Sequence, residues 1–462
     1  MDINRSIFRQ YDIRGRVDVD LNSALVYALG QAFGTTIKRR GGQSVAVGRD
    51  CRHSGVQICD ALTRGLRATG IDVVSLGLVS TPMVYFAAHT QDVNGTVAVT
   101  GSHNPSDWNG FKFCVGASSF YGDDIQGLLA LIERQDYETG TGSLTELSIK
   151  ADYINDLSCR LKPLSKPIKV VIDAGNGTGG LAAGEIYRNM GAEVDELFCE
   201  PDGAFPNHHP DPTVEKNLVD LKARLIAVEA DLGIAFDGDA DRIGVVDRKG
   251  RVIWGDQLLT LFGLSLLKTH QDLKIVGEVK CSKVMYDTLR EAGAEVEMWK
   301  VGHSLIKARM KKTGSLLAGE MSGHLFFADR FYGFDDAVYA GGRLLEILGE
   351  SKLTLEALVD QLPKTYATPE LRLSCPDESK FQVPEKAAQF FGQSYQVSLI
   401  DGVRIDFESG WGLIRASNTQ PVLVLRVEAT SETARDDYLK RLIDWLKAEA
   451  PDVSTHIEAS HS

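Results

Sequence analysis

The sequence predicts an α/β protein with three tandem related α/β domains, mixed sheets and a smaller α+β domain at the C-terminal end, arranged around a central cleft. Two observations carry this prediction. A strand–helix–strand pattern occurs three times, and the C-terminal part departs from it in composition. The length of 462 residues agrees, because about 150 residues per domain gives three or four domains.

The repeat is clearest at glycines that end a helix just before a short strand. Glycine suits the left-handed position that follows a helix. The three glycines are Gly70, Gly191 and Gly293. Each unit begins with an apolar strand, and its third strand runs into a polar, glycine-rich loop. The first strands are 44–48, 168–172 and 274–277, and the third strands are 96–100, 232–236 and 316–318. Because ligands gather at the carboxyl ends of such strands, we expect the three loops to face one cleft.

Four domains follow from this pattern. We expect them at residues 1–150, 151–253, 254–364 and 365–462, each carrying one functional loop. Prolines mark the junctions near 163–167 and 363–384. The last domain combines two apolar strands with a final helix that repeats leucine and isoleucine at helical spacing, which predicts α+β structure.

Composition limits the class of protein. Fifty Lys and Arg against 63 Asp and Glu give a net charge of −13, which argues against a nucleic-acid partner bound through its phosphates but leaves a local basic pocket open. No apolar run is near 18 residues and the N-terminus lacks a signal-peptide stretch, so we expect no membrane partner. Seven scattered cysteines without a CxxC pair favour a reducing, cytoplasmic setting. We expect a monomer, with a dimer as the alternative.

An acidic loop follows the third strand of the second unit. Asp237, Asp239 and Asp241 would repel one another unless a cation lay between them, and oxygen ligands alone suit Mg²⁺. An EF-hand is excluded because Arg242 and Arg248 occupy the positions that need glycine and glutamate. A solvated turn is the alternative. The metal site is favoured because the loop follows an apolar strand and ends in an arginine that could bind phosphate.

The equivalent loop of the first unit, residues 100–105, carries a serine. Ser102 is followed by His103, and Lys112 lies downstream; these groups could move protons or bind anions. Alone, the segment favours a helix-capping turn. The acidic loop in the equivalent place favours phosphoryl transfer, because charge neutralisation supplies most of its catalysis.

Two further loops carry ligand-binding side chains. Residues 319–324 offer a carboxylate, a hydroxyl and an imidazole suited to a sugar, with a plain polar turn as the alternative. Residues 415–419 group a guanidinium with hydroxyls and an amide, which suits a phosphate, with a hairpin turn as the alternative. His208 and His209 lack a neighbouring acidic or thiol partner in the sequence and favour a surface turn.

Together these motifs resemble the α-D-phosphohexomutase superfamily, and most closely its bacterial phosphomannomutase/phosphoglucomutase branch. The resemblance runs from residues 8–15 to Arg426, with the four loops in the family's order. It implies three related α/β domains and a smaller fourth. It also implies an isomerase that interconverts hexose 1-phosphate and hexose 6-phosphate through a phosphoserine enzyme and a bound hexose 1,6-bisphosphate. The implied substrates are the mannose and glucose 1- and 6-phosphates.

The resemblance also implies roles for individual residues. Ser102 would carry the phosphoryl group and, with Asp237, Asp239 and Asp241, hold one Mg²⁺. The implied catalytic residues are Ser102, His103, Lys112, Arg242 and Arg14. The implied substrate-binding residues are Tyr11, Lys280, Gly302, His303, Glu320, Ser322, His324, Arg415, Ser417, Asn418 and Thr419.

Two residues depart from the family pattern. Ala240 replaces a glycine of the acidic loop, which requires a backbone angle that alanine can adopt or a slight shift of the loop. Val301 replaces a hydroxyl residue, so one hydrogen bond to substrate is expected to be missing. A phosphoglucosamine mutase, a metal-dependent sugar-phosphate phosphatase and a non-catalytic sugar-phosphate sensor are the alternatives. The form of loop 319–324 favours glucose and mannose phosphates over glucosamine phosphate.

Overall fold

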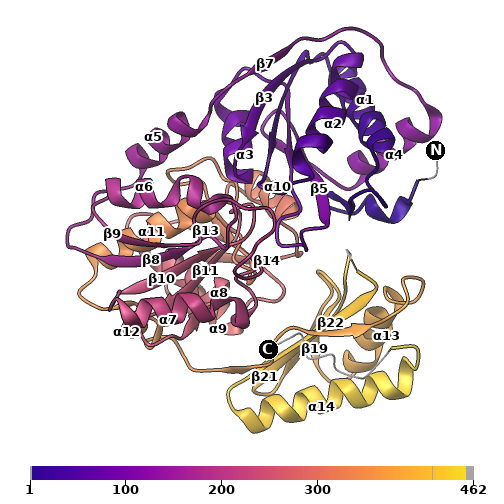
Figure 1. Ribbon diagram of the computed structural model, residues 1–462. Coiled ribbons are helices and arrows are strands. Elements are labelled where there is room, and N and C mark those ends of the chain that lie inside the picture. Colours follow the sequence, from indigo (N-terminus) through magenta and orange to yellow (C-terminus); the bar gives the residue numbers. More distant parts are fainter. Residues whose placement is uncertain (1–2, 419, 454–462) are drawn as a thin grey trace.

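The computed structural model describes residues 3–418 and 420–453 (Figure 1). Strands within these residues form four sheets that follow one another along the chain. Figure 1 shows the three α/β parts in indigo to orange and the C-terminal part in yellow below them. Among the described residues, no helix is long and apolar enough to cross a membrane.

The first sheet has the strand order β1-β5-β4-β2-β3-β7, with β6 paired to β5. Its strands are β1 Ile13–Arg16, β2 Ser44–Arg49, β3 Asp72–Leu78, β4 Gly95–Val99, β5 Trp108–Val115, β6 Ser118–Phe120 and β7 Leu144–Glu146. The helices of this part are η1 Arg5–Ile7, α1 Ser23–Arg39, α2 Gly55–Ala68, α3 Thr81–Thr90 and α4 Asp123–Arg134.

The second sheet has the order β12-β11-β10-β8-β9 and the third has the order β14-β13-β15-β16. Their strands are β8 Lys169–Asp173, β9 Glu193–Leu197, β10 Leu232–Phe236, β11 Ile243–Asp247, β12 Val252–Ile253, β13 Lys274–Glu278, β14 Glu295–Trp299, β15 Leu317–Gly319 and β16 Leu325–Phe327. The helices are α5 Lys150–Arg160, η2 Thr178–Leu181, α6 Ala183–Asn189, η3 Glu215–Leu218, α7 Val219–Ala227, α8 Gly255–Leu266, α9 Lys283–Glu291, α10 His303–Thr313, α11 Ala337–Glu350 and α12 Leu355–Val359.

The three α/β sheets share one core topology. In each, the first strand (β2, β8 or β13) lies between two parallel neighbours, and the third strand of the unit then pairs with an antiparallel strand. Gly70, Gly191 and Gly293 have φ angles of 88°, 96° and 104°, the left-handed conformation expected after a helix. The predicted repeat is therefore present, and its loops 100–107, 237–242 and 320–324 occupy equivalent places at the sheet edges.

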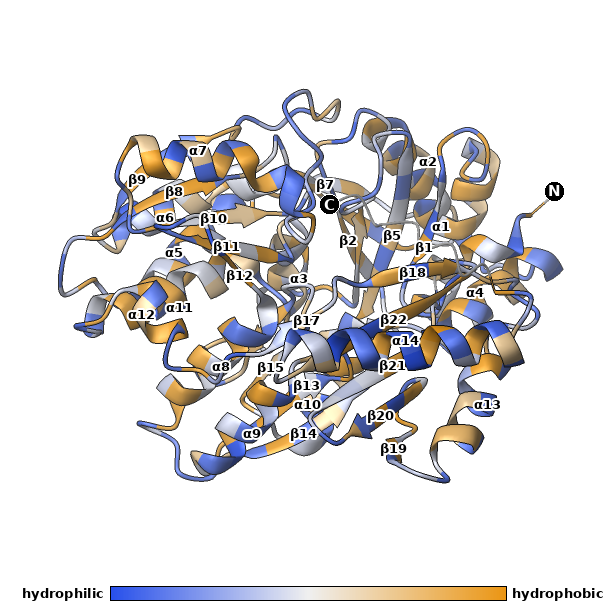
Figure 2. Ribbon diagram, turned by 90° about the horizontal axis from the view of Figure 1, so that it is seen from below, coloured by the Kyte–Doolittle hydropathy of each residue, from blue (hydrophilic) through white to orange (hydrophobic). Residues whose placement is uncertain are grey.

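The fourth sheet is antiparallel and differs from the repeat, as predicted. Its strands are β17 Tyr366–Ala367, β18 Leu371–Ser374, β19 Gln396–Ser398, β20 Val403–Phe407, β21 Gly410–Ala416 and β22 Val422–Ala429, and its helices are α13 Gln382–Phe391 and α14 Glu432–Glu449. Figure 2 shows α14 with polar and apolar residues along its length. Its apolar residues Leu442, Trp445 and Leu446 are buried.

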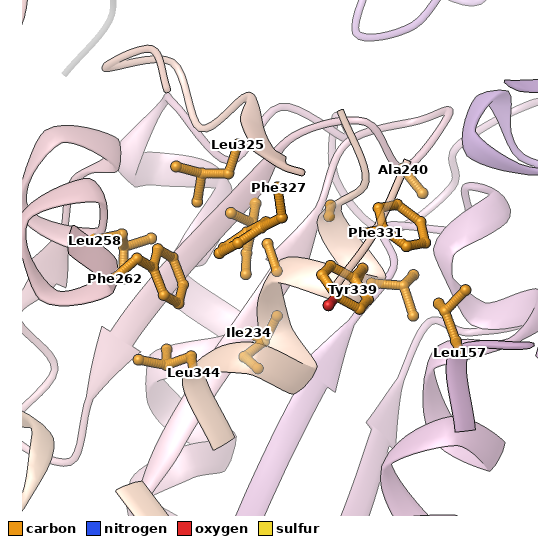
Figure 3. Packing of buried hydrophobic residues seen from close by; sticks show 14 of the residues in the cluster. Leu157, Ile234, Ala240, Leu258, Phe262, Leu325, Phe327, Phe331, Tyr339 and Leu344 are labelled. Atoms are coloured by element: carbon orange, nitrogen blue, oxygen red, sulfur yellow. The ribbon is translucent and has the colours of Figure 1, made fainter. Parts of the chain in front are cut away.

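The second and third sheets share a hydrophobic core. Helix α11 follows the third sheet, yet it packs on strands β10 and β11 of the second (Figure 3). Ile234 of β10 and Leu344 of α11 lie in one cluster with Phe262 of α8. The hydroxyl of Tyr187 donates to the Val338 carbonyl at 2.9 Å across the same contact. This common core fixes the position of loop 237–242 of the second unit relative to loop 320–324 of the third.

Close packing of helices α1 and α2 depends on a glycine. A Cβ atom on Gly65 would lie 2.1 Å from the Tyr27 carbonyl oxygen, so we expect Gly65→Ala to destabilise the first unit by about 1–3 kcal/mol. Gly127 of α4 is exposed and has no neighbour within 4 Å of an added Cβ. Gly127→Ala should therefore stabilise the protein by about 0.5–1 kcal/mol. Calorimetric unfolding of both variants tests the pair, and equal effects would contradict the packing described.

Candidate active site

Ser102 lies just beyond the carboxyl end of β4, in the first of the three equivalent loops. It is buried, and its φ angle of 48° places it in the left-handed region. Its hydroxyl donates to Asp237 Oδ2 at 2.8 Å, and its Oγ lies 3.1 Å from His103 Nδ1. The serine loop of the first unit thus directly contacts the acidic loop of the second.

The acidic loop gathers three buried carboxylates. Oxygen atoms of Asp237, Asp239 and Asp241 lie within 4.8 Å of one another. Burial and the charge of Asp239 raise the pKa of Asp237 well above its ordinary value. Burial would also raise the pKa of Asp239, but the charge and hydrogen bond of Lys112 lower it below its ordinary value. The Lys112 ammonium contacts both Asp239, at 2.8 Å, and Asp241.

The free oxygens of this loop fit a hard cation. Asp239 Oδ1 and Asp241 Oδ1 are buried and have no hydrogen-bond partner among the described residues. A buried acceptor without a donor is unfavourable, and carboxylate oxygens are the ligands that Mg²⁺ prefers. Ala240 adopts a φ angle of 63°, so this alanine takes the left-handed conformation of the glycine it replaces, at a cost of about 1–2 kcal/mol.

Arg242 connects the acidic loop to the third loop. Its Nε donates to His324 Nε2 at 2.9 Å, so that ring nitrogen carries the lone pair. A neutral His324 therefore bears its proton on Nδ1, which lies 3.0 Å from Asp335 Oδ2. The His303 ring stacks on the His324 ring with centroids 5.5 Å apart. The two imidazoles and the guanidinium form one continuous cluster.

Glu320 is the buried carboxylate of the third loop. Its Oε1 accepts a 2.6 Å hydrogen bond from the Gly302 backbone N–H, and Ser322 Oγ lies 3.4 Å from its Oε2. Gly302 has a φ angle of 130°, and a Cβ there would lie 2.6 Å from the Tyr11 ring. A residue with a side chain would be strained at position 302 and would collide with the Tyr11 ring. Glycine therefore lets Tyr11 lie against the backbone of the third unit.

Tyr11 also contacts the fourth unit. Its hydroxyl donates to the Val301 carbonyl at 2.7 Å and accepts from Asn418 Nδ2 at 2.8 Å. Burial raises the pKa of Tyr11 to about 12, so the phenol is neutral. Val301 thus contributes its backbone carbonyl to this contact, although its side chain carries no hydroxyl. The first, third and fourth units meet at this one hydroxyl.

Two basic residues beside this junction are paired with acids. Arg415 Nε donates to Asp401 Oδ2 at 2.8 Å, and Lys280 Nζ lies 3.1 Å from Glu370 Oε2. Burial would lower the pKa of Lys280, but Glu370 and the neighbouring acids raise it, so the ammonium keeps its charge. An anionic ligand would find both cations close to the tyrosine junction.

The structure brings most of the predicted site residues into this chain of contacts. Arg14 reaches the serine loop by donating to Asn104 Oδ1 at 3.0 Å. Lys112 lies on β5, and its ammonium contacts carboxylates of the acidic loop, where the resemblance implied a place beside the phosphoserine. Ser417 is buried at the end of β21. Thr419 lies outside the described residues.

Sequence reasoning missed two residues that contact the serine loop. Asp50 and Arg52 lie beneath it, directly after β2 at the same edge of the sheet. The backbone bends at His208, as a surface turn requires, but the side chains of His208 and His209 are half-buried and have partners that the sequence did not reveal. His208 Nε2 lies 3.0 Å from Asp173, and His209 Nε2 donates to the His103 carbonyl. The available signal was position, since charged residues after β2 must lie beside residues that follow β4.

Comparison with known proteins places these features in one family. The family models of phosphoglucomutase/phosphomannomutase alpha/beta/alpha domains I, II and III match residues 5–139, 151–250 and 254–366. The model of the C-terminal domain of the same family matches residues 370–444. The chain belongs to the phosphoglucomutase/phosphomannomutase family of phosphohexomutases. The family is confirmed, and with it the predicted isomerase class and the predicted fold.

Individual relatives agree over nearly the full chain. It is 47% identical to a phosphoglucomutase of Neisseria gonorrhoeae, covering 94% of this chain and 95% of the relative. It is 44% identical to a phosphomannomutase/phosphoglucomutase of Pseudomonas aeruginosa, covering 92% of each. A crystal structure of a family protein from Burkholderia thailandensis matches with a TM-score of 0.92 at 44% identity, covering 97% of this chain and 99% of that one.

Removing one carboxylate should weaken cation binding. We expect Asp239→Asn to lower the affinity for Mg²⁺ by at least about tenfold, because an amide lacks the charge that offsets the cation. Calorimetric titration with Mg²⁺, or Mn²⁺ binding followed by electron paramagnetic resonance, measures this without an activity assay. Asp220→Asn, at an exposed position of α7, is the matched control. Equal affinity in the two variants would contradict a metal site at this loop.

Proposed function

We propose that this enzyme interconverts mannose or glucose 1-phosphate and the corresponding 6-phosphate, with Ser102 as the phosphoryl carrier. One observation carries the proposal: the buried Ser102 hydroxyl contacts the carboxylate cluster of a second loop, and that cluster continues through Arg242 into a third. Buried charge surrounding one hydroxyl suits phosphoryl transfer, in which neutralisation of oxygen charge is the main catalytic task.

The transfer balances without loss of phosphate. The bond between phosphorus and Ser102 Oγ breaks as a free hydroxyl of the sugar monophosphate forms the new P–O bond. The sugar hydroxyl loses its proton and the serine oxygen ends protonated. The resulting hexose 1,6-bisphosphate reverses its orientation in the site and returns its other phosphoryl group to Ser102. Mg²⁺, when held by Asp237, Asp239, Asp241 and Ser102, would neutralise charge on the phosphoryl oxygens.

His103 is placed to exchange the serine proton. Burial and the charge of Arg242 lower its pKa well below the ordinary value, so the imidazole is neutral near pH 7. Its Nδ1, 3.1 Å from Ser102 Oγ, can then accept the hydroxyl proton when the phosphoryl group returns. We assign His103 this role, with Arg14, Arg242 and Lys112 supplying positive charge around the serine.

The remaining loops would hold the sugar and its second phosphate. Glu320 presents a buried carboxylate beside Ser322, His324 and His303, which suits ring hydroxyls. Arg415, Lys280 and Tyr11, with Asn418, Ser417 and Thr419, suit the phosphate that is not transferred. A separate clamp is needed because the intermediate must stay bound while it reverses. This retention favours a mutase over a phosphatase.

The surroundings of the reaction belong to the same proposal. Free cysteines, several of them buried, support a reducing cytoplasm as the place of action. We propose a monomer with the four domains bounded as the sequence predicts, and sugar phosphates rather than nucleic acids or membranes as partners.

Replacing the nucleophile tests the phosphoryl carrier. We expect Ser102→Ala, assayed with Mg²⁺ and a trace of glucose 1,6-bisphosphate, to lose mutase activity by at least about 10³-fold. Intact mass should show loss of the added phosphate in this variant. Ser106→Ala, an exposed serine of the same loop, should behave like the wild type. Turnover of Ser102→Ala at the wild-type rate would refute the assignment.

A substrate comparison separates the alternatives. Rates with glucose 1-phosphate, mannose 1-phosphate and glucosamine 1-phosphate should be measured side by side, together with inorganic phosphate. We expect the first two sugars to be converted well, glucosamine 1-phosphate poorly, and almost no inorganic phosphate. Preference for glucosamine 1-phosphate would identify a phosphoglucosamine mutase, and stoichiometric phosphate release would identify a phosphatase.

A further inference from the structure

One fully buried arginine lies beneath the serine loop. Arg52 follows β2, and parallel pairing of Arg49 with Val99 places the residues after β2 beside those after β4. The Arg52 side chain is 0% exposed, and its guanidinium carbon lies 5.2 Å from the centre of the Phe205 ring of the second unit. It contacts neither the Ser102 hydroxyl nor the carboxylate cluster in any described hydrogen bond.

Every N–H of this guanidinium has a partner. Nε donates to Asp50 Oδ2 at 3.1 Å. Nη2 donates to the carbonyls of Ser102 and Asn104 at 2.8 and 2.6 Å, and Nη1 donates to the carbonyls of Pro105 and Trp108. A guanidinium carries five N–H donors in a fixed fork, so all five are used. Three of them hold carbonyls of the serine loop, and a fourth holds the carbonyl of Trp108, the first residue of β5.

Asp50 also hydrogen-bonds to the serine loop. Its Oδ2 accepts from Thr100 Oγ1 at 2.8 Å and from the Gly101 N–H at 3.1 Å. Thr100 Oγ1 in turn accepts from the Ser102 N–H at 2.8 Å. The carbonyl and the N–H of Ser102 are therefore both fixed by the Asp50–Arg52 pair, one directly and one through Thr100.

Ser102 needs this support because of its backbone. A non-glycine residue at a φ angle of 48° is disfavoured by about 1–2 kcal/mol and persists only when its surroundings hold it there. A relaxed backbone would swing the hydroxyl away from Asp237 and His103. Four carbonyls bound to one rigid, buried fork provide the restraint that a flexible ammonium could not.

We propose that Arg52, together with Asp50, is a positioning residue that holds Ser102 in the conformation required for phosphoryl transfer. The inference rests on the proposed role of Ser102 as carrier. It concerns the rate of transfer and not the binding of the sugar, because the two side chains hydrogen-bond to each other, to the serine loop and to Trp108, and to none of the proposed sugar-binding residues.

Arg52→Lys tests the role, with Arg343→Lys as the matched control. Arg343 is also buried and ion-paired, to Asp329, but lies on α11 away from the loop. Displacement of a reacting group by about 1 Å costs about 10²-fold, so we expect kcat of Arg52→Lys to fall by about 10²-fold with KM unchanged. Phosphorylation of Ser102 by glucose 1,6-bisphosphate, followed by intact mass, should slow equally. The backbone N–H groups of residues 101–104 and 106–108 should exchange hydrogen faster in Arg52→Lys only.

A gentler pair keeps the test decisive if Arg52→Lys does not fold. Thr100→Val removes the link between Asp50 and the Ser102 N–H, and Thr100→Ser keeps it. We expect loss of kcat and faster exchange in Thr100→Val, with recovery in Thr100→Ser. Wild-type kcat per folded molecule in Arg52→Lys or Thr100→Val, or a loss without faster exchange of the loop, would overturn the inference. Ser102→Ala, run alongside, distinguishes this failure from failure of the proposed carrier.

Discussion

Repulsion among three buried carboxylates is the constraint on which the site depends. Asp237, Asp239 and Asp241 share one loop, and their charges must be offset from outside it. Lys112 of the first unit does so in part, and the Ser102 hydroxyl meets the remaining carboxylate. The charges of this loop are thus offset only where the first and second units meet. Its two unpartnered oxygens mark the place where a cation would complete the balance.

Repetition of one topology explains why the loops can meet. Each functional loop of the first three units joins a parallel strand to the antiparallel strand beside it, so all three lie at equivalent sheet edges. The common core around α11 holds the second and third units together. Tyr11 then links the first and third units to the fourth through one hydroxyl. The chemistry is therefore divided among units, and no single one contains a complete site.

The sequence was sufficient for the repeat, the odd fourth unit and the loops, because glycines after helices and polar loops after apolar strands are local signals. It did not reveal Arg52 or His209, whose partners are backbone carbonyls. Such contacts leave no pattern in side-chain spacing and depend on strand pairing. The resemblance implied a place for Lys112 beside the phosphoserine, but its contact with two carboxylates is set by the antiparallel pairing of β5 with β4. The contacts that the sequence did not reveal depend on where strand pairing places each loop, and not on which residues the loop contains.

Transfer of a labelled phosphoryl group tests the central claim most directly. Enzyme labelled on Ser102 with ³²P is mixed with unlabelled glucose 1-phosphate for a single turnover, and the products are separated. A serine carrier that hands its phosphoryl group to the sugar and recovers the other one predicts label in glucose 6-phosphate and glucose 1,6-bisphosphate, with unlabelled phosphate on the enzyme. Label released as inorganic phosphate, or retained on the serine while product forms, would contradict it.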